Sequence, residues 1–367
     1  MKTATITFHA SHNYGSMLQA FALQQAIRRL GHENKIINFR TQQQRNQYAR
    51  PYDKQENGLK KLARIMLSLG HIHSLDKKYD LFECFLKEQL DLTEQYSSLE
   101  ELVEAHFDFD CYISGGDQIW NTSPADFNWS YFLPFVKQGK RISYAVSMGP
   151  HADQQVQERQ KIQKLLSHYD HISVRETGTR QLIQSMTEKD VTISLDPAFL
   201  LSQEEWATKY RNLPLPSGEY ILMYSPVYNK DVYSISQKIA KKWHIQVICT
   251  TFVPQTLLYP SLKLYLATGP WEFLNLLANA KLVISGSFHA LVFSILFQTP
   301  FFAVNGDKDN RMHTLLKTFG LANRTITSSN YVEKMRTAFE CNFGNTKNIL
   351  EKERFRSLQY LDNAIKY

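Results

Sequence analysis

The sequence has few cysteines and none of the common catalytic or metal-binding signatures. Its 367 residues include four cysteines, which lie far apart and form no CxxC pair. The HExxH, GxSxG and P-loop motifs are also missing,. A chain of this length does not need a disulfide framework, so we expect no metal site and only reduced, packing cysteines, as in a cytosolic protein. These cysteines are Cys84, Cys111, Cys249 and Cys341.

Long apolar runs and a strong charge excess are equally lacking. The longest apolar run, residues 291–304, is interrupted by Gln298 and Pro300, which makes it too short to span a bilayer,. The start, "MKTATITFHA", predicts a strand rather than a signal peptide,. The formal net charge of +7 is spread along the chain. It suits an anionic substrate or a loose contact with a membrane surface, so we expect a cytoplasmic protein that binds no nucleic acid.

Short β-rich runs alternate with helix-length segments along most of the chain. Such alternation predicts an α/β protein with parallel sheets covered by helices on both faces. Helices are expected at 16–31, 59–90, 231–242, after Gly269-Pro270, after the strand at 281–285, and at 310–319. Strands are expected at 4–10, 35–39, 109–117, 141–149, 171–176, 191–197, 220–225, 245–250, 281–285 and 300–304.

A polar stretch at 202–220, punctuated by Pro214, Pro216 and Gly218, interrupts this alternation,. We therefore predict two Rossmann-like doubly wound domains, 1–205 and 206–367, that face each other. The first domain is expected to bind the acceptor and the second to bind the donor. The C-terminal helix of the second is free to pack back against the rest of the protein. In such folds ligands bind outside the carboxyl ends of the strands, which directs attention to the strand-to-helix turns.

The first such turn contains Asn13, Tyr14 and Gly15 just before a helix. Free backbone N–H groups at a helix start bind anions or polar sugar groups. The glycine spacing is not GxGxxG, so a dinucleotide site is not indicated. The alternative is an N-cap turn with a polar surface.

The second turn, "SGGDQIWNTS", gathers Asp117, Gln118, Trp120 and Asn121 after two glycines. A carboxylate and two amides can hold sugar hydroxyls, while an indole covers the apolar face of the ring. These residues are predicted to bind the acceptor. The alternative is a turn in which the tryptophan is core and the aspartate is a cap.

Three further turns carry basic residues. Arg175 ends a strand and can present its planar fork to a carboxylate or phosphate, or simply pair with Glu176,. His289 lies between the end of a strand and the start of a helix, where it is a candidate proton donor. The alternative is a histidine that only caps the helix and has its hydrogen bonds satisfied there. The residues predicted to bind the donor around it are Ser285, Ser287, Lys308 and Arg311. For Lys308 and Arg311 the alternative is a solvent-exposed first turn of a helix.

The segment 59–69 has an apolar stripe beside basic residues. We expect this stripe to pack against the domain; the alternative is a helix lying on an anionic membrane. The apolar positions are Leu59, Leu62, Ile65, Met66 and Leu69, and the basic ones are Lys60, Lys61 and Arg64.

Taken in chain order, these motifs resemble the polysaccharide pyruvyl transferase family. The resemblance spans about residues 5–322. It rests on "NYGSMLQAFALQ", "SGGDQIWN", "RISYAVSMG", "HISVRE", "DPAFLL", "VISGSFHALVFSILFQTPFFAV" and "RMHTLLKTFGL".

The resemblance implies a fold similar to GT-B glycosyltransferases and a transfer of the pyruvyl group from phosphoenolpyruvate to a glycan. The product is a cyclic ketal and phosphate is released, with no metal or organic cofactor. His289 corresponds to the family's general acid or base, and Arg175 to the arginine that binds the donor. Asp117 is our candidate for orienting or deprotonating the acceptor.

One departure from the family pattern concerns the histidine motif. Several members have Arg-Leu-His where this chain has Ser287-Phe288-His289. Arg311 or Lys308 is the candidate replacement for the missing arginine.

The expected acceptor is a sugar of a cell-surface polysaccharide, such as a capsule or exopolysaccharide, or its lipid-linked precursor. The sequence does not give the oligomeric state. Two alternatives stay open: a GT-B glycosyltransferase that uses a nucleotide sugar, and a catalytically degenerate scaffold in polysaccharide assembly.

Overall fold

The first half of the chain forms a parallel five-stranded sheet with the order β3-β2-β1-β4-β5. The computed structural model describes residues 1–150 and 158–367. Single parallel bridges join β5 and the residues after it to the small β6-β7 pair. The elements of this half are β1 (Lys2–Ile6), α1 (Tyr14–Arg29), β2 (Glu33–Phe39), α2 (Gln42–Tyr48), α3 (Gly58–Ser68), α4 (Ile72–Gln89), β3 (Leu92–Tyr96), α5 (Leu99–Glu104), β4 (Cys111–Gly115), β5 (Lys140–Tyr144), α6 (Arg159–Leu166), β6 (Ile172–Val174), α7 (Thr177–Gln184), β7 (Val191–Ile193), η4 (Pro197–Leu200) and α8 (Gln203–Tyr210).

The second half forms a parallel six-stranded sheet with the order β10-β9-β8-β11-β12-β13. In both sheets the strand order reverses beside the first strand, β1 or β8, which is the doubly wound pattern. The elements of this half are β8 (Tyr220–Tyr224), α9 (Lys230–Trp243), β9 (Gln246–Cys249), η5 (Pro254–Leu258), β10 (Leu262–Leu264), α10 (Pro270–Ala278), β11 (Leu282–Ser285), α11 (Phe288–Phe297), β12 (Phe301–Val304), α12 (Asn310–Thr318), β13 (Thr325–Ile326), α13 (Tyr331–Lys334) and α14 (Thr346–Lys366).

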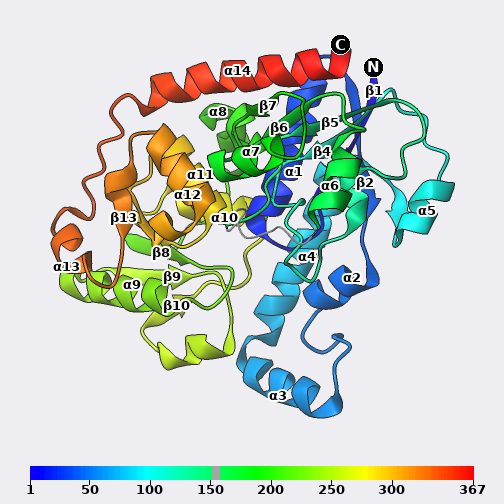
Figure 1. The fold of residues 1–367 in the computed structure, drawn as a ribbon. Coiled ribbons are helices and arrows are strands. Elements are labelled where there is room, and N and C mark those ends of the chain that lie inside the picture. Colours follow the sequence, from blue (N-terminus) through cyan, green and yellow to red (C-terminus); the bar gives the residue numbers. More distant parts are fainter. Residues whose placement is uncertain (151–157) are drawn as a thin grey trace.

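The two sheets face each other across helices that share one hydrophobic core (Figure 1). Buried side chains of α1 and α4 pack there against those of α10 and α11. Tyr14 of α1, for example, stacks on Phe273 of α10 with ring centroids 4.3 Å apart. The expected pair of Rossmann-like domains in a GT-B-like arrangement is therefore confirmed.

The last helix, α14, returns to the first sheet and brings the two termini together in Figure 1. Tyr360 donates a hydrogen bond to the carbonyl of Ser143 (3.0 Å), and Ser357 accepts one from the backbone of Leu195 (2.9 Å). No helix in the described part of the chain is long and apolar enough to cross a membrane.

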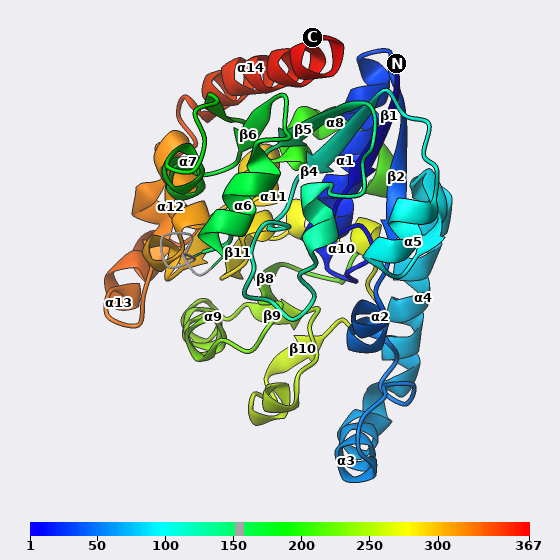
Figure 2. The ribbon, with the colours of Figure 1, turned by 45° about the vertical axis from the view of Figure 1, so that its right-hand side comes forward.

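The predicted helical region 59–90 forms two helices, α3 and α4, separated near Gly70. Figures 1 and 2 both show α3 projecting from the end of the molecule opposite α14. Its apolar stripe is exposed, with Leu59 83% and Met66 62% accessible. The expectation that this stripe packs against the domain is thus wrong, because α3 extends beyond the sheet that would cover it.

Candidate functional site between the two sheets

His289 lies in the first turn of α11 and packs directly against the start of α1. A Cβ added to Gly15 would lie closer than 3.0 Å to Cβ, Cγ and Nδ1 of His289. The absence of a side chain at position 15 is therefore what lets the imidazole approach α1. The first turns of α1, in the first half of the chain, and α11, in the second half, therefore meet at this ring.

Arg175 and His289 converge on one buried carboxylate, Asp196. The Arg175 Nη1 atom lies 2.6 Å from Asp196 Oδ2, and His289 Nε2 lies 3.3 Å from the same oxygen. Burial alone would raise the pKa of Asp196, but His289 and Arg175 outweigh it and hold this pKa well below its usual range,. Asp196 therefore stays ionised and links a residue of the first half to one of the second.

Several buried hydrogen-bond donors at this point have no partner among the described residues. They are the Nε and Nη2 atoms of Arg175 and the Nε2 atom of His289, whose contact with Asp196 is not aligned as a hydrogen bond. A buried polar group without a partner costs about 1–3 kcal/mol. Donors of this kind, with a guanidinium among them, fit the oxygens of a bound anion.

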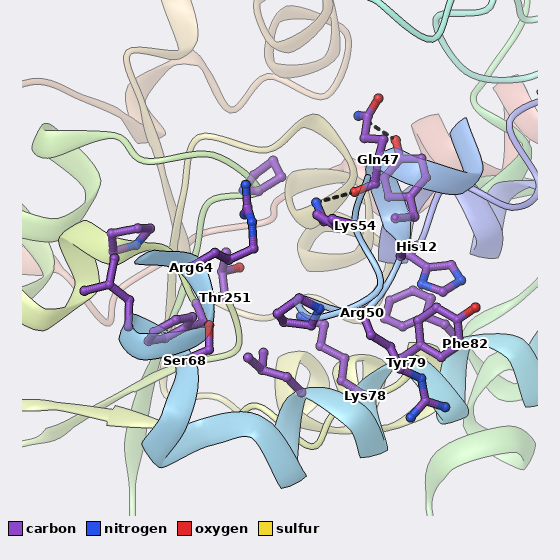
Figure 3. A pocket seen from close by; sticks show the side chains of 18 of the residues that line it. His12, Gln47, Arg50, Lys54, Arg64, Ser68, Lys78, Tyr79, Phe82 and Thr251 are labelled. Carbon is purple, nitrogen blue, oxygen red and sulfur yellow. Dashed lines mark hydrogen bonds between the residues drawn. The ribbon is translucent and has the colours of Figure 1, made fainter. Parts of the chain in front are cut away.

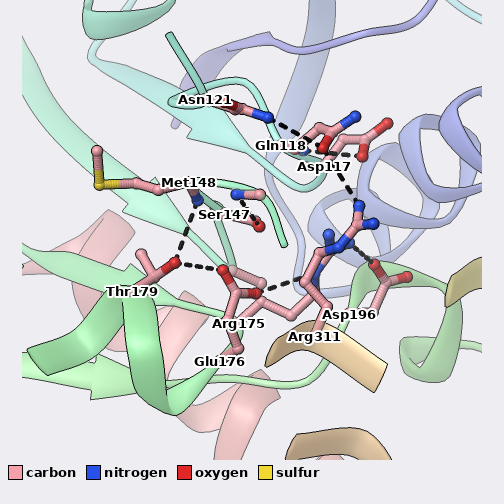
Figure 4. A network of polar contacts seen from close by, with 12 residues as sticks. Asp117, Gln118, Asn121, Ser147, Met148, Arg175, Glu176, Thr179, Asp196 and Arg311 are labelled. Carbon is pink, nitrogen blue, oxygen red and sulfur yellow. Dashed lines mark hydrogen bonds and ion pairs between the residues drawn. The ribbon is translucent and has the colours of Figure 1, made fainter. Parts of the chain in front are cut away.

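Arg311 of α12 extends the site towards the turn after β4. Its Nη1 donates to the side chain of Gln118 at 3.2 Å, and its Nη2 pairs with Asp309 at 2.6 Å. The neighbouring Asp117 accepts hydrogen bonds from the Ser16 hydroxyl at the start of α1 and from the backbone of Gln118. Figure 4 shows this network, which crosses between the two halves of the chain.

We call these two networks, which meet where Arg175 and Arg311 line the same cavity, the interdomain polar cluster. Its members are Ser16, Asp117, Gln118, Arg175, Glu176, Asp196, His289 and Arg311.

A cavity of about 250 Å³ borders this cluster. Arg175 and Asp196 line it from the first half, Phe288 and Arg311 from the second, and Arg356 from α14. The Arg175 guanidinium carbon lies 4.1 Å from the centroid of the Phe288 ring, which restrains the guanidinium by a cation–π contact,. Three guanidinium groups thus line the cavity, and each is paired with a carboxylate: Arg175 with Asp196, Arg311 with Asp309 and Arg356 with Glu353.

Glu176 belongs to the cluster in a way the sequence did not indicate. Its side chain is buried beside Arg175, with 3.6 Å between Arg175 Nε and Glu176 Oε2, and it accepts a hydrogen bond from Thr179. Burial raises the pKa of Glu176 in spite of the nearby arginines,. The simple Arg175–Glu176 pair considered from the sequence is therefore looser than the Arg175–Asp196 pair.

Two aromatic residues predicted to touch the acceptor are core residues. The indole of Trp120 is fully buried, stacks on Phe132 with centroids 4.8 Å apart and is unavailable to a sugar. Tyr14 is buried in the shared core, and its hydroxyl donates to the carbonyl of Thr268. In both cases the large ring packs in the apolar core instead of facing a ligand at the turn. The acceptor contacts predicted for these two residues are therefore corrected.

Other predicted residues shape the turns rather than reach into the cavity. Asn13 caps α1 by accepting from the backbone of Gly15, and Ser285 donates to the carbonyl of Tyr224 while accepting from the backbone of Ser287. The ligand contact predicted for Ser285 is corrected, because this buried hydroxyl is bonded to the backbone as donor and as acceptor. Asn13 is half-buried and caps α1 through its side-chain oxygen, so its contact with the acceptor stays a prediction.

Three predicted residues differ in how they lie near the cluster. Asn121 is buried and donates to Gln118 at 3.3 Å, which steadies the turn. The Ser287 side chain does not cap α11. Lys308 is exposed and lies outside the cavity lining, so Arg311, rather than Lys308, adds positive charge here.

A larger cavity, about 590 Å³, lies next to the start of α1 between α2, α3 and α4 and the loops after β8 and β9. Five basic and no acidic residues appear among its described lining. His12, three residues before Gly15, forms part of its wall. Burial lowers the pKa of one lining residue, Lys78, to about 8. The basic residues are Arg50, Lys54, Lys60, Arg64 and Lys78.

Sequence reasoning missed Asp196 and Ser16 as members of the site and considered Glu176 only as a partner of Arg175. Asp196 follows the strand β7 in "DPAFLL", so its position after a strand end was the available signal. Its ion pairs join segments 21 and 93 residues away, and no spacing in the sequence displays such a pairing.

A family model described as "Polysaccharide pyruvyl transferase" matches residues 13–308. None of the curated proteins matches the chain. Among solved structures, the UDP-GlcNAc 2-epimerase of Methanocaldococcus jannaschii, in complex with UDP-GlcNAc and UDP, is 13% identical with a TM-score of 0.55. That alignment covers 97% of this chain and 99% of the epimerase.

A second similar structure is a putative UDP-N-acetylglucosamine 2-epimerase from Listeria monocytogenes. It is 11% identical with a TM-score of 0.57, and the alignment covers 96% of this chain and 90% of that one. At such low identity these likenesses show the fold alone. They agree with the pair of facing Rossmann-like domains described above.

Proposed function

The chain belongs to the polysaccharide pyruvyl transferase family, and from this premise we propose that phosphoenolpyruvate is its donor. The family makes it a transferase that acts on a polysaccharide. In the proposed reaction the pyruvyl group bridges two hydroxyls of one sugar as a cyclic ketal, and phosphate leaves.

The observation that carries this proposal is the set of buried, unpartnered donors around Asp196. Phosphoenolpyruvate is a small molecule with a phosphate and a carboxylate, and it needs several N–H donors in a confined space. Arg175, which lines the cavity of about 250 Å³, has two donor atoms without a hydrogen-bond partner, and His289, which is outside that lining but contacts Asp196, has one. Arg311 lines the same cavity and is our candidate for the arginine that the Ser287-Phe288-His289 order lacks.

In the proposed chemistry His289 acts as the general acid. The protonated ring gives its proton to the methylene carbon of the donor, which makes C2 electrophilic, and one sugar hydroxyl then bonds to C2. The second hydroxyl displaces phosphate; one hydroxyl proton restores the imidazolium and the other leaves with phosphate. General acid–base help of this kind is typically worth about 10²–10⁴ in rate.

Asp196 and Asp117 have separate roles in this scheme. Asp196, 3.3 Å from His289 Nε2, is a positioning residue that orients the ring and holds Arg175 in place. Asp117 is the candidate for orienting an acceptor hydroxyl. Its hydrogen bond from Ser16 would then be exchanged for one from the sugar.

The acceptor is assigned to the cavity of about 590 Å³ beside His12. Its aromatic and basic lining suits a saccharide that carries negative charge, such as a lipid-linked precursor of a cell-surface polysaccharide. The reaction would then take place in the cytoplasm, at the inner face of the membrane. The lining aromatic residues are Tyr48, Tyr79, Phe82 and Phe252.

Thermal-shift titration of the purified protein tests the donor. We expect stabilisation by phosphoenolpyruvate and none by UDP-GlcNAc. The reverse result would favour the alternative, a glycosyltransferase that uses a nucleotide sugar. If neither stabilises the protein and no transfer is detected, the degenerate-scaffold alternative gains.

The role of His289 is tested by His289→Ala with His313→Ala as the matched control, since His313 is exposed on α12. Mass spectrometry of precursor glycans incubated with phosphoenolpyruvate should show the pyruvyl increment with the control and not with His289→Ala. Phosphoenolpyruvate binding should survive in both. Normal turnover by His289→Ala would refute the assignment.

A further inference from the structure

The helix α3 presents an apolar face that no part of the described protein covers. Leu59, Leu62, Met66 and Leu69 are 56–83% accessible and follow one another at helical spacing. Three large apolar side chains exposed on one face of α3, with Leu69 continuing this face just after the helix, are unusual for a surface that meets only water,.

The charges of α3 lie on a different face. Lys60, Lys61 and Arg64 are the only charged residues between positions 57 and 75. Lys60, Arg64 and Ser68 line the 590 Å³ cavity, so this side of α3 faces the protein while the apolar side faces away. An apolar face flanked by lysines is the pattern of a helix that lies in a membrane interface.

A second apolar tip stands on the other side of the same cavity. The short helix η5 exposes Leu257 and Leu258, the latter 72% accessible, and Val227 is exposed beside Pro226. Pro226 and Pro254 both line the cavity. Figures 1 and 2 show η5 (yellow-green, after β9) projecting from the same end of the molecule as α3.

All five charged residues in the described lining of the cavity between the two tips are basic. Figure 3 shows Arg50, Lys54, Arg64 and Lys78 gathered around it. Arg64 is paired with Glu56, whereas neither Lys60 nor Lys61 forms an ion pair within the described ranges. Basic residues close to an anionic bilayer each contribute about 1 kcal/mol to attraction.

We propose that α3 and η5 dock the protein on an anionic lipid bilayer, with the basic cavity between them facing the headgroups. The charge distribution favours a bilayer over a second copy of the chain. A bilayer would meet both the apolar tips and the basic residues beside them, whereas a symmetric contact through the apolar face of α3 would leave Lys60 and Lys61 without an anionic partner, since no acidic residue lies between positions 57 and 75. The inference rests on the proposed function only in explaining why docking is useful, namely to reach a lipid-linked acceptor. Vesicle binding itself requires no catalysis.

Co-sedimentation with vesicles tests this surface. The probes are vesicles of phosphatidylcholine alone and vesicles of equal parts phosphatidylglycerol and phosphatidylcholine. The wild-type protein should sediment with the anionic vesicles and far less with the neutral ones. Leu62→Ser/Met66→Ser should weaken binding roughly tenfold or more, from the apolar area withdrawn, and Leu257→Ser/Leu258→Ser should also weaken it.

The matched control is Phe355→Ser, which removes a large apolar side chain that is 68% accessible on α14, at the opposite end of the molecule. It should bind vesicles like the wild type. Lys60→Glu/Lys61→Glu should abolish the preference for anionic vesicles. All these positions are at the surface, so circular dichroism should show intact folding.

Two results would overturn the proposal. One is a wild-type protein that ignores anionic vesicles, or a Leu62→Ser/Met66→Ser variant that binds them like Phe355→Ser. The other is a dimer, seen by sedimentation velocity, that Leu62→Ser/Met66→Ser dissociates while vesicles have no effect. Thermal shift by phosphoenolpyruvate is expected to be the same in all these variants, so failure of docking and failure of the donor assignment can be told apart.

Discussion

Replacing Gly15 by alanine should displace His289 and reduce activity with little change in the rest of the fold. The new Cβ would lie closer than 3.0 Å to three atoms of His289, two of which are the rigid Cβ and Cγ. Carbon atoms in contact prefer about 3.5–4.0 Å. The ring or the start of α1 must therefore move by more than about 0.5 Å.

The magnitude follows from two opposing effects. Overpacking of a tight site costs about 1–3 kcal/mol, while replacing glycine by alanine within a helix gains about 0.5–1 kcal/mol. The net loss of stability should thus be small, about 0–2.5 kcal/mol by combining these ranges. The loss of rate should be larger, because a misplacement of about 1 Å at a catalytic group can cost about 10²-fold.

The assay compares Gly15→Ala with Gly286→Ala, a glycine three residues before His289 on the other side of the turn. A Cβ at position 286 would meet its nearest neighbour, Val232 Cγ2, at an ordinary 3.5 Å. Pyruvyl transfer by Gly286→Ala should match the wild type, and transfer by Gly15→Ala should fall about tenfold to a hundredfold.

Gly15→Ala also separates two explanations for the glycine. Alanine keeps the backbone N–H, so a site that needs only that N–H for an anion would be unaffected. If the two variants had equal activity and equal unfolding midpoints, the steric account of Gly15 would be refuted.

Three further predictions concern the cluster and the corrected residues. Asp196→Asn should lower the free energy of unfolding at pH 7 by about 3–5 kcal/mol, because it breaks a buried ion pair. Since the pKa of Asp196 is depressed in the folded protein, the wild type should lose this extra stability as the pH falls below the usual aspartate range,. Equal urea midpoints of the two proteins at pH 7 would contradict the ion pair. Trp120→Phe should cost roughly 1–3 kcal/mol of stability and leave the acceptor KM unchanged, whereas a raised KM without loss of stability would return the indole to the acceptor site,. Arg311→Ala should weaken phosphoenolpyruvate binding measured by calorimetry and Lys308→Ala should not, and equal effects would remove the distinction between them.

The fold was predictable because most of its strands have a local signal in the sequence. Runs such as 220–225 and 281–285 are apolar and end in turn residues, so their alternation with helices predicted two parallel sheets correctly. The edge strands β3 and β10 were not predicted, since "LTEQY" and "LKL" carry polar residues and bury only part of each strand.

The candidate site was predictable only where a reactive or charged side chain lies in the turn directly after a strand. His289, Arg175 and Arg311 were named from such turns and prove to lie together. Trp120 could not be separated from a sugar-binding tryptophan, because its environment comes from Phe132 and Tyr169 in later segments. Exposure of the α3 stripe was likewise invisible, since the same spacing describes a helix packed on a domain.

The most direct measurement is a calorimetric titration of phosphoenolpyruvate into the wild-type protein and into Arg175→Gln. The account predicts saturable binding by the wild type and a loss of roughly tenfold or more in affinity for Arg175→Gln, as expected for charge-assisted hydrogen bonds. Absence of binding by the wild type, or undiminished binding by Arg175→Gln, would contradict a donor site beside Asp196 and His289.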